Sequence, residues 1–247
     1  MTILRTEAEK DAIREPGLIL RDVFALLSSR IVPGVSTLEI DQLVENFIRS
    51  RGAEPAFKGY KGYPATICAS VNEVVVHGIP SEKIVLAEGD IIGIDVGAKK
   101  NDFFSDGART YPVGKISSTA GKLLEATRRC LDEGLKQAVA GNRISDISNA
   151  VQLAAEDAGF KEVRSFVGHG IGKALHEPPE VPNWGPKGKG PELKEGLVLA
   201  VEPMINVGSR DVRVLDDGWT AVTVDGMLSA HFEETIIIGK EKAEIIT

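Results

Sequence analysis

The chain has 247 residues, 43% of them apolar, which is enough to bury the core of one large domain or two small ones. Its net charge of -7 and its dispersed Lys and Arg exclude a basic stripe for nucleic acid or an anionic membrane. No apolar run could span a membrane and residues 1–17 lack a secretory signal, so we expect a cytoplasmic protein. Without a CxxC pair, Cys68 and Cys130 predict reduced thiols and no thiolate zinc site.

The first half of the chain predicts two helices. One is expected around residues 18–30, after a break at Pro16, and the other within 33–53. In the second helix Ser36 and Glu39 fit a capping box, and apolar residues recur on one face. Both helices precede strand-like segments, an order typical of α+β proteins.

The second half repeats this order, with helices expected around 118–140 and within 140–160. A shift of 107 positions lays its second helix on that of the first half, and the same shift lays the apolar run EGDIIGIDV on EGLVLAVEP. Asp95 then meets Glu202. We therefore predict an internal duplication, with antiparallel sheet covered by helices around a central cleft.

Four acids occupy apolar, strand-like runs. IIGIDVGAKKNDFFSDGARTYPV predicts a hairpin, and a turn at 100–101 would place Asp95 directly opposite Asp106. A slipped register, with one acid facing solvent, is the alternative. Glu202 and Glu233 have similar neighbours. An isolated buried carboxylate costs tens of kcal/mol in an idealised estimate, so the four acids predict a site for two divalent cations.

Two of the four histidines lie in SFVGHGIGKALHEPPEVP, which is too rich in Gly and Pro for a helix. His169 lies between glycines, so its ring can closely approach a metal, and His176 can face the same cleft without being a ligand. A shift of 92 lays His77-Gly78-Ile79 on His169-Gly170-Ile171. Oxygen ligands with one or two imidazoles suit Mn, Fe(II), Co or Zn.

Six motifs, spread from about residue 3 to the end, resemble the type I methionine aminopeptidases of metallopeptidase family M24: SVNEVVVHGIP, IDVG, FSDGARTYPVG, GHGIGKALHEPP, LAVEPM and SAHFEETI. The resemblance implies one catalytic domain over 1–247 with the pseudo-twofold pita-bread α+β fold. It also implies hydrolytic removal of the initiator methionine from nascent polypeptides, with preference for a small second residue. We expect a monomer in transient contact with the ribosome.

The resemblance also implies a role for each candidate residue. Two divalent ions would be held, with Asp106 and Glu233 bridging, by Asp95, Asp106, His169, Glu202 and Glu233. The catalytic residues would be His77, His176 and Glu202, of which the histidines contact the peptide and Glu202 carries a proton. The methionine pocket would be lined by Tyr60, Tyr63, Cys68, Leu175 and Trp219, together with His77 and His176. A monovalent cation would lie at Asn72, Val74 and Ser229.

Three positions depart from the family pattern. Leu175 stands where many relatives carry an aromatic residue, so the pocket could be wider or less selective. DGAR at 106–109 replaces a more usual DxSR. His231 stands where relatives often have Gln, and we expect it either to support a ligand or to lie at the surface.

Four alternatives compete with this function. An Xaa-Pro aminopeptidase or dipeptidase shares the fold and ligands, but usually has an additional amino-terminal domain, for which the short segment before His77 leaves little room. Type II methionine aminopeptidases carry a helical insertion that does not fit between His176 and Glu202. A binding module should have lost ligands, and a metal-storage or structural protein does not explain histidines that are not ligands.

Overall fold

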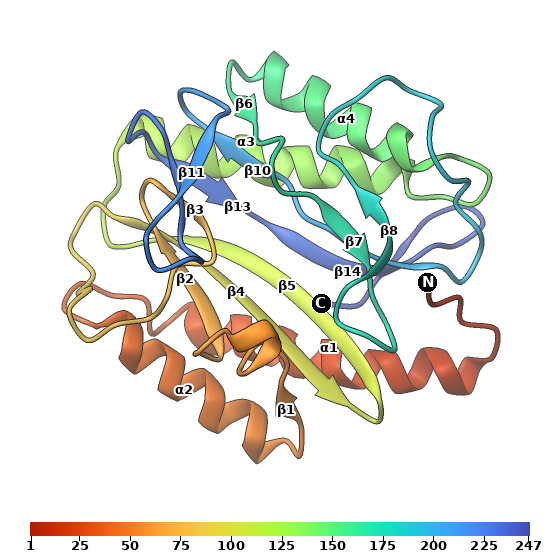
Figure 1. Ribbon diagram of the computed structural model, residues 1–247, viewed down its shortest axis with the longest axis horizontal. Helices are drawn as coiled ribbons and strands as arrows, with labels where there is room; N and C mark the ends of the chain where they lie inside the picture. The colour runs from red at the N-terminus through yellow and green to blue at the C-terminus, as the bar shows by residue number, and fades with distance from the viewer.

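The computed structural model describes residues 1–247 and is built on one large antiparallel sheet with helices packed against it (Figure 1). In chain order the strands are β1 (Glu54–Pro55), β2 (Ile67–Val71), β3 (Val74–Val76), β4 (Ile91–Lys100), β5 (Phe103–Pro112), β6 (Lys161–Glu162), β7 (Gly168–Gly170), β8 (Glu177–Val181), β9 (Val198–Val201), β10 (Met204–Asn206), β11 (Val212–Val214), β12 (Ala221–Thr223), β13 (Ser229–His231), β14 (Glu233–Ile237) and β15 (Glu244–Ile245). The large sheet has the order β1, β4, β5, β14, β9, β7, β8, with β2 also paired to β4 and β15 to β14.

The helices form two pairs that pack on different halves of the sheet. They are α1 (Glu7–Leu27), α2 (Thr37–Ser50), α3 (Ser118–Gln137) and α4 (Ile144–Asp157), with a short 3-10 helix η1 (Tyr60–Gly62). Helix α1 contacts β4 and β5 and α2 contacts β1 and β2, whereas α3 contacts β9 and β13 and α4 contacts β6 and β8. Figure 1 shows the two pairs at opposite sides of the strands. The predicted α+β class with helix-covered antiparallel sheet is confirmed.

The predicted repeat is present in the fold. Helices α2 and α4 begin and end at residues 107 positions apart, and β4 and β9 begin with the same offset. At the start of each helix an acid accepts a hydrogen bond from the N–H of the cap residue, Glu39 from Ser36 at 2.8 Å and Asp146 from Arg143 at 2.7 Å. The shift of 107 residues therefore superimposes segments that fold in the same way.

The alignment of His77 with His169 is wrong. Strand β7 pairs with β9 as β2 pairs with β4, and His169 lies opposite Ala200. The position 107 residues before Ala200 is Gly93, whose partner is Ser70. Ser70 is therefore the counterpart of His169, and His77 lies beyond the end of β3. The tripeptide His-Gly-Ile recurs, but the register of the strands decides which residues are equivalent.

The first helix is longer than expected, because Pro16 lies inside α1 and does not end it. Thr6 and Glu9 form a capping box that starts the helix well before the proline. A proline in a helix interior costs about 3 kcal/mol, since it removes one hydrogen bond and crowds the preceding turn. Burial of the apolar face of α1 against β4 and β5 offsets this cost.

Gly17 gives a test of how closely α1 is packed. A Cβ atom built on Gly17 would overlap the Ile246 side chain, whereas one built on Gly121 in α3 would meet nothing within 4 Å. We expect Gly17→Ala to lower the free energy of unfolding by about 1–3 kcal/mol through overpacking. The matched control Gly121→Ala should raise it, by about 1 kcal/mol at most, through helix propensity. Urea denaturation of both variants checks this, and equal shifts in the same direction would contradict it.

The β4–β5 hairpin was predicted, but its turn lies one residue later than expected. Lys100 pairs with Phe103, so the turn residues are Asn101 and Asp102, both left-handed with φ of 50° and 61°. A type I′ turn requires positive φ at both positions, which Asn and Asp tolerate. Asp95 consequently lies opposite Ala108, two residues from the predicted partner. A slip of two residues keeps each side chain on its original face of the sheet.

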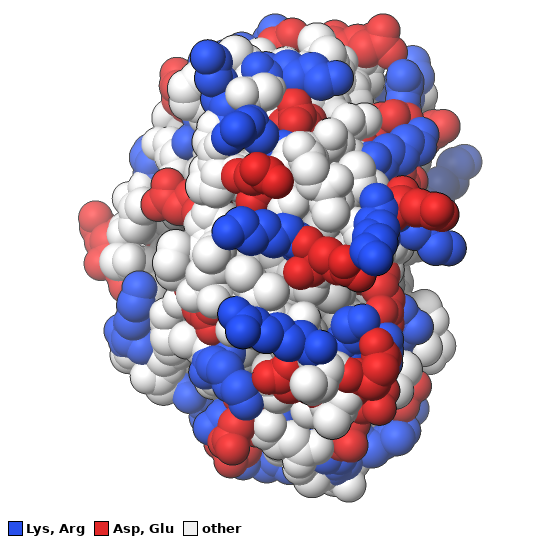
Figure 2. Space-filling model, turned by 90° about the vertical axis from the view of Figure 1, so that its right-hand side faces the viewer, with Lys and Arg blue, Asp and Glu red and all other residues white.

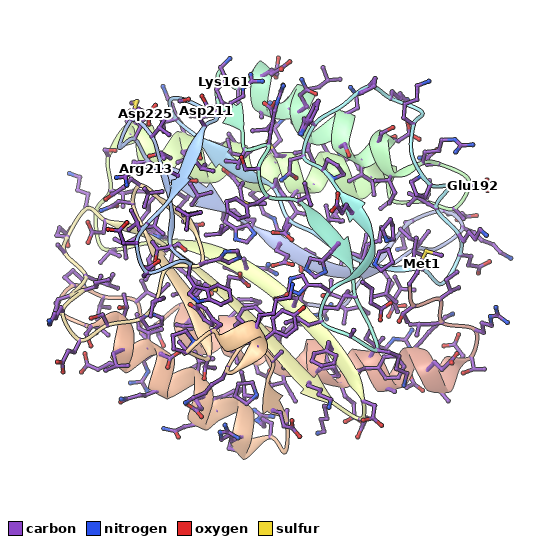
Figure 3. The ribbon with its side chains drawn as sticks, in the orientation of Figure 1. Met1, Lys161, Glu192, Asp211, Arg213 and Asp225 are labelled. Atoms are coloured by element: carbon purple, nitrogen blue, oxygen red, sulfur yellow. The ribbon has the colours of Figure 1, made fainter.

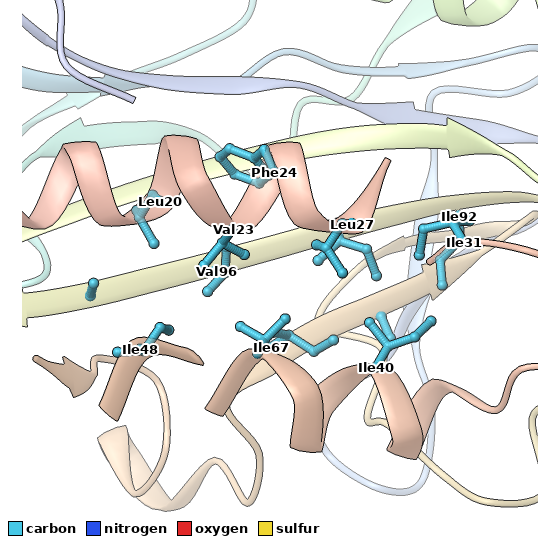
Figure 4. Close-up of a cluster of buried hydrophobic side chains, with 14 of the residues drawn as sticks. Leu20, Val23, Phe24, Leu27, Ile31, Ile40, Ile48, Ile67, Ile92 and Val96 are labelled. Carbon is cyan, nitrogen blue, oxygen red and sulfur yellow. The ribbon is translucent and has the colours of Figure 1, made fainter. Parts of the chain in front are cut away.

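The hydrophobic core on the first-half side lies between the helices and the sheet (Figure 4). Side chains of β4 alternate, so Ile92 and Val96 face the helices while Asp95 faces the other way. The helix-facing cluster includes Leu20, Val23, Phe24, Leu27, Ile40, Ile48, Ile67, Ile92 and Val96. The helices thus cover one face of β4 and leave the other free to carry polar side chains.

Two small three-stranded sheets complete the structure, one with the order β13, β10, β6 and the other β11, β12, β3. Figure 3 shows Asp211, Arg213 and Asp225 at the outer end of the second sheet. Asp225 accepts backbone hydrogen bonds from Ser209 and Met227, which fixes the loops there. The inner end of this sheet, at β3, leads into His77.

The surface carries charges of both signs. On the face drawn in Figure 2, Lys and Arg alternate with Asp and Glu, and neither sign forms a continuous patch. None of the helices combines the length and the apolar character that a bilayer crossing requires. Cys68 and Cys130 are both buried and unpaired.

Candidate active site

The sheet register brings the predicted acids to one face. Asp106 lies opposite Gly97 and Asp95 opposite Ala108, so the two acids are diagonal neighbours across β4 and β5. Glu233 lies opposite Ala108 on the next strand, β14, and therefore faces the same side. Glu202 directly follows β9, the strand beyond β14. Four carboxylates, three on strands and one directly after a strand, thus meet at the centre of the sheet.

His169 joins this group from β7. Its Nε2 atom lies 3.9 Å from Asp106 Oδ2 and 3.7 Å from Glu202 Oε1. Ligand atoms of Asp106, His169 and Glu233 all lie within 4.8 Å of one another. Asp95 and Glu202 lie outside this tight group of three but line the same cavity. The structure therefore brings all five predicted ligands together.

Two buried polar atoms in this group, Asp95 Oδ1 and Glu233 Oε1, have no hydrogen-bond partner. A buried acceptor left without a partner costs about 1–3 kcal/mol, and more if it is charged. Hard carboxylate oxygens with one imidazole nitrogen are donors that a divalent cation prefers. The residues present therefore fit a divalent metal, which the orphaned oxygens would bind.

Burial and mutual repulsion change the acidity of these carboxyls. Burial raises the pKa of Asp95, Glu202 and Glu233 well above the usual carboxyl range, and repulsion from Asp106 raises it further. Burial also raises the pKa of Asp106 to about 7, although its hydrogen bond from the Gly107 N–H opposes the shift. Without a cation the group keeps protons near neutral pH.

These raised pKa values predict that metal binding releases protons. At pH 6 a divalent cation must displace protons from the carboxyls, whereas above the Asp106 pKa of about 7 there are fewer to displace. Affinity for Mn²⁺ should therefore rise with pH between 6 and 8. Calorimetric titration of chelator-treated protein with Mn²⁺, in two buffers of different ionisation enthalpy, measures the released protons. Equal heats in both buffers at pH 6 would contradict the prediction.

The sequence around His169 explains how its ring is held. The Nδ1 atom lies 2.9 Å from the Gly170 carbonyl oxygen, so an Nδ1–H donates there and Nε2 keeps a free lone pair for the cleft. Burial lowers the pKa of His169 to about 4, so the ring is neutral at pH 7. A Cβ at Gly168 would overlap the Ala200 carbonyl, and one at Gly170 would overlap that of Pro178. Only glycine on both sides lets β7 fit between β8 and β9.

The other two predicted histidines lie at the rim of the same cavity, which measures about 300 Å³. The centroid of the His176 ring is 4.2 Å from that of His169, and its Nδ1 lies 3.0 Å from the Tyr60 hydroxyl. His77 has left-handed backbone with φ of 60°, and its ring stands edge-on to Phe166. Burial lowers the pKa of both histidines, and His169 adds to the effect at His176. Both rings are therefore neutral hydrogen-bonding groups at pH 7.

An apolar wall closes one side of the cavity. The Tyr63 hydroxyl is within 3.1 Å of the carbonyl oxygens of Ile67 and Gly78, and its ring meets Trp219 edge-on at 5.0 Å. Burial raises the pKa of the Cys68 thiol, so Cys68 is a packing residue. The predicted pocket residues all line this cavity: Tyr60, Tyr63, Cys68, Leu175 and Trp219.

The three residues predicted for a monovalent cation lie near one another, where β3 packs against β13. The Ser229 N–H donates to the Asn72 carbonyl at 2.9 Å. The Asn72 side chain donates to Asp90 and accepts from the Ile91 N–H. Val74 begins β3, which lies against β13.

Sequence reasoning missed several residues of the site. Asn183 is almost fully buried and donates to the Glu202 carbonyl at 3.0 Å. Nothing in the local sequence PNWG indicates this role. Phe57 and Phe166 also line the cavity, and their only signal was hydrophobicity. His231 is buried, with Nε2 3.6 Å from Glu202 Oε2, so the expectation of a surface position is wrong and that of support for a ligand fits.

Comparison with known proteins agrees with this geometry. Residues 11–240 match the profile of metallopeptidase family M24. The chain is 51% identical to "Methionine aminopeptidase 1" of Bacillus subtilis (strain 168), over 100% of this chain and 99% of the relative. It matches the crystal structure of a methionine aminopeptidase from Thermotoga maritima with a TM-score of 0.97 and 41% identity, over 100% of this chain and 99% of that one. The chain belongs to metallopeptidase family M24, and within that family to the methionine aminopeptidases.

A prolidase from Pyrococcus furiosus shares the fold at lower similarity. Its TM-score is 0.79 at 23% identity, and this chain covers 65% of it. A likeness of this size shows the pita-bread fold alone. The high identity over full length goes with the methionine aminopeptidases, so the Xaa-Pro alternative is not favoured.

Proposed function

We propose that the protein removes the N-terminal methionine of nascent polypeptides, preferring a small second residue, with two divalent ions drawn from Co, Mn, Fe(II) and Zn. The observation that supports this is the meeting of four buried carboxylates and one imidazole, with orphaned oxygens on Asp95 and Glu233. Asp95, Asp106, His169, Glu202 and Glu233 would hold the ions. When bound, such ions polarise a carbonyl and lower the pKa of a water toward about 7.

Glu202 would carry the proton during the reaction. Its carboxyl lies at the edge of the group, with Oε1 3.7 Å from His169 Nε2, and it lines the cavity that a peptide would enter. Its backbone is fixed by the hydrogen bond from Asn183 to its carbonyl. A fixed backbone keeps the carboxyl within reach of a peptide in the cavity.

His77 and His176 would hold the scissile peptide. If the Tyr60 hydroxyl donates to His176 Nδ1, the proton of the neutral ring lies on Nε2, which can then donate to an oxygen in the cavity. Donors already in place where negative charge develops lower the barrier without reorganisation. His77 also lines the cavity, with its ring edge-on to those of Phe166 and Trp219.

We expect His176→Ala to lower kcat for Met-Ala-Ser by about 100-fold, which is typical for the loss of one such donor. Tyr60→Phe should have a smaller effect, because it removes only the hydroxyl that orients the ring. Steady-state kinetics of both variants with Mn²⁺ measures this. A larger loss in Tyr60→Phe than in His176→Ala would argue against a direct role for the imidazole.

The apolar wall would select methionine. An unbranched thioether packs closely in a narrow cavity and gains from contact between sulfur and aromatic rings, here those of Tyr63 and Trp219. Leu175 is fully buried in this wall and adds no aromatic ring.

We also propose a single catalytic domain over 1–247 that acts as a monomer. A monovalent cation would bind near Asn72, Val74 and Ser229, where the Asn72 carbonyl meets Ser229. The substrate is the N-terminal methionine of a nascent chain, so the protein would act in the cytoplasm in transient contact with the ribosome.

Two peptides test the proposed function. Chelator-treated protein should cleave neither Met-Ala-Ser nor Ala-Pro-Ala, and addition of Mn²⁺, Fe²⁺, Co²⁺ or Zn²⁺ should restore cleavage of Met-Ala-Ser alone. Faster cleavage of Ala-Pro-Ala would overturn the substrate assignment. No turnover with any of the four metals would favour a binding module that has kept the fold.

A further inference from the structure

Glu202 lies between two histidines, one beside each of its carboxylate oxygens. Oε1 is 3.7 Å from His169 Nε2, and Oε2 is 3.6 Å from His231 Nε2. The first contact lies within the proposed metal site. The second involves a residue to which no role has been assigned beyond support for a ligand.

The backbone of His231 is held in place, and its ring is shielded from water. The His231 backbone N–H donates to the Thr110 hydroxyl at 3.0 Å, and that hydroxyl donates back to the His231 carbonyl at 2.8 Å. On its other side His231 pairs with Met204 in β10. The residue is 3% exposed, and its Nε2 atom is buried without a hydrogen-bond partner. A buried ring nitrogen of this kind requires a polar partner, and the Glu202 carboxylate faces it.

We propose that His231 is a positioning residue that donates from Nε2 to Glu202 Oε2 and so keeps Oε1 directed at the metal beside His169. This inference rests on the proposed role of Glu202 as a ligand. The distance of 3.6 Å is longer than a hydrogen bond, but the terminal torsion of a glutamate is soft, so a small rotation can close it. A carboxylate whose Oε2 is already held loses less rotational freedom when its Oε1 binds a cation. Partners of this kind orient ligands in many metal sites.

Substitution of His231 by Gln, by Phe and by Leu distinguishes a positioning role from direct metal binding by His231. The amide nitrogen of Gln is the same number of bonds from Cβ as His Nε2, so His231→Gln keeps a donor but loses the imidazole. His231→Phe and His231→Leu remove the donor and differ in volume, so one can replace the other if folding is impaired. Phe232→Leu is a matched control, because the neighbouring Phe232 packs in the hydrophobic cluster of Leu131 and Ile236.

The experiment is a calorimetric titration of each chelator-treated variant with Mn²⁺ at pH 7.5, with thermal melting to confirm the fold. His231→Phe and His231→Leu should weaken Mn²⁺ binding by about 10–100-fold, as losses of such partners do elsewhere. They should lower kcat for Met-Ala-Ser with little change in KM, whereas His231→Gln and Phe232→Leu stay within a few-fold of the unaltered protein in affinity and kcat.

Either of two results would overturn the inference. Mn²⁺ binding by His231→Phe or His231→Leu as tight as that of the unaltered protein would show that no donor is needed. Binding by His231→Gln as weak as that by His231→Phe would show that the imidazole itself is required, as for a direct ligand. Failure of the unaltered protein to bind Mn²⁺ would instead reject the proposed metal site as a whole.

Discussion

Asp106→Asn is expected to lower kcat/KM for Met-Ala-Ser by about a thousandfold or more at saturating Mn²⁺. The Asp106 ligand atom lies within 4.8 Å of those of His169 and Glu233, so its charge would act on whatever cations bind there. Metal ions stabilise a transition state by several kcal/mol, and each 1.4 kcal/mol corresponds to about a factor of ten in rate. An amide keeps the size of the side chain and removes its charge.

The fold should survive this change. The Asp106 N–H donates to the Thr235 hydroxyl at 2.9 Å, and that hydroxyl donates to the Asp106 carbonyl at 2.7 Å, so the backbone is held independently of the carboxylate. Ser105→Ala is the matched control, because Ser105 is buried on the other face and its hydroxyl has no partner. The control should keep its activity. An Asp106→Asn variant within tenfold of the unaltered protein would show that this carboxylate is not central.

Glu234→Ala is expected to lower the free energy of unfolding by about 3–5 kcal/mol, the usual cost of removing one partner from a buried ion pair. Glu234 follows Glu233 and so faces the helices, where it is almost fully buried. It accepts from Arg109 Nη2 at 2.8 Å and from the Thr247 hydroxyl at 2.9 Å, with Arg128 at 3.4 Å. Without it, Arg109, whose side chain is 17% exposed, loses its countercharge.

The same network reaches the site, because Arg109 Nη1 donates to the Glu233 carbonyl at 2.6 Å. Glu234→Ala should therefore also weaken Mn²⁺ binding. Glu244→Ala is the control, since its ion pair with Arg14 is partly exposed and pairs of that kind contribute about 1 kcal/mol or less. Urea denaturation at pH 7.5 compares the two variants. A loss of stability in Glu234→Ala no larger than in Glu244→Ala would contradict a structural role for this pair.

Much of the site could be predicted because strands alternate with a period of two. Asp95 and Asp106 were placed on one face from an incorrect turn, and the prediction survived because the error was two residues. Acids in apolar runs require a charge partner wherever they fold, so a cation site among the four acids could be predicted from their pattern, whereas the individual roles came from the resemblance to methionine aminopeptidases. The capping box of α2 was likewise local, because Ser36 and Glu39 are close in sequence.

Contacts between distant segments could not be predicted. Pro16 was taken as a break, but the packing of α1 on the sheet overrides local preference. Arg109 and Glu234 meet across β5 and β14, and the sequence around neither residue identifies the other as its partner. The same is true of Asn183 and His231, which reach Glu202 from separate segments. His77 was matched to His169 by a tripeptide that carries no information on register.

The central claim is that Asp95, Asp106, Glu202 and Glu233 tolerate one another because divalent cations bind between them. Anomalous diffraction at the manganese absorption edge, from crystals grown with Mn²⁺, tests this directly. Two peaks between these carboxylates and His169 are predicted. Anomalous density elsewhere on the molecule, with none among the four acids, would contradict the claim.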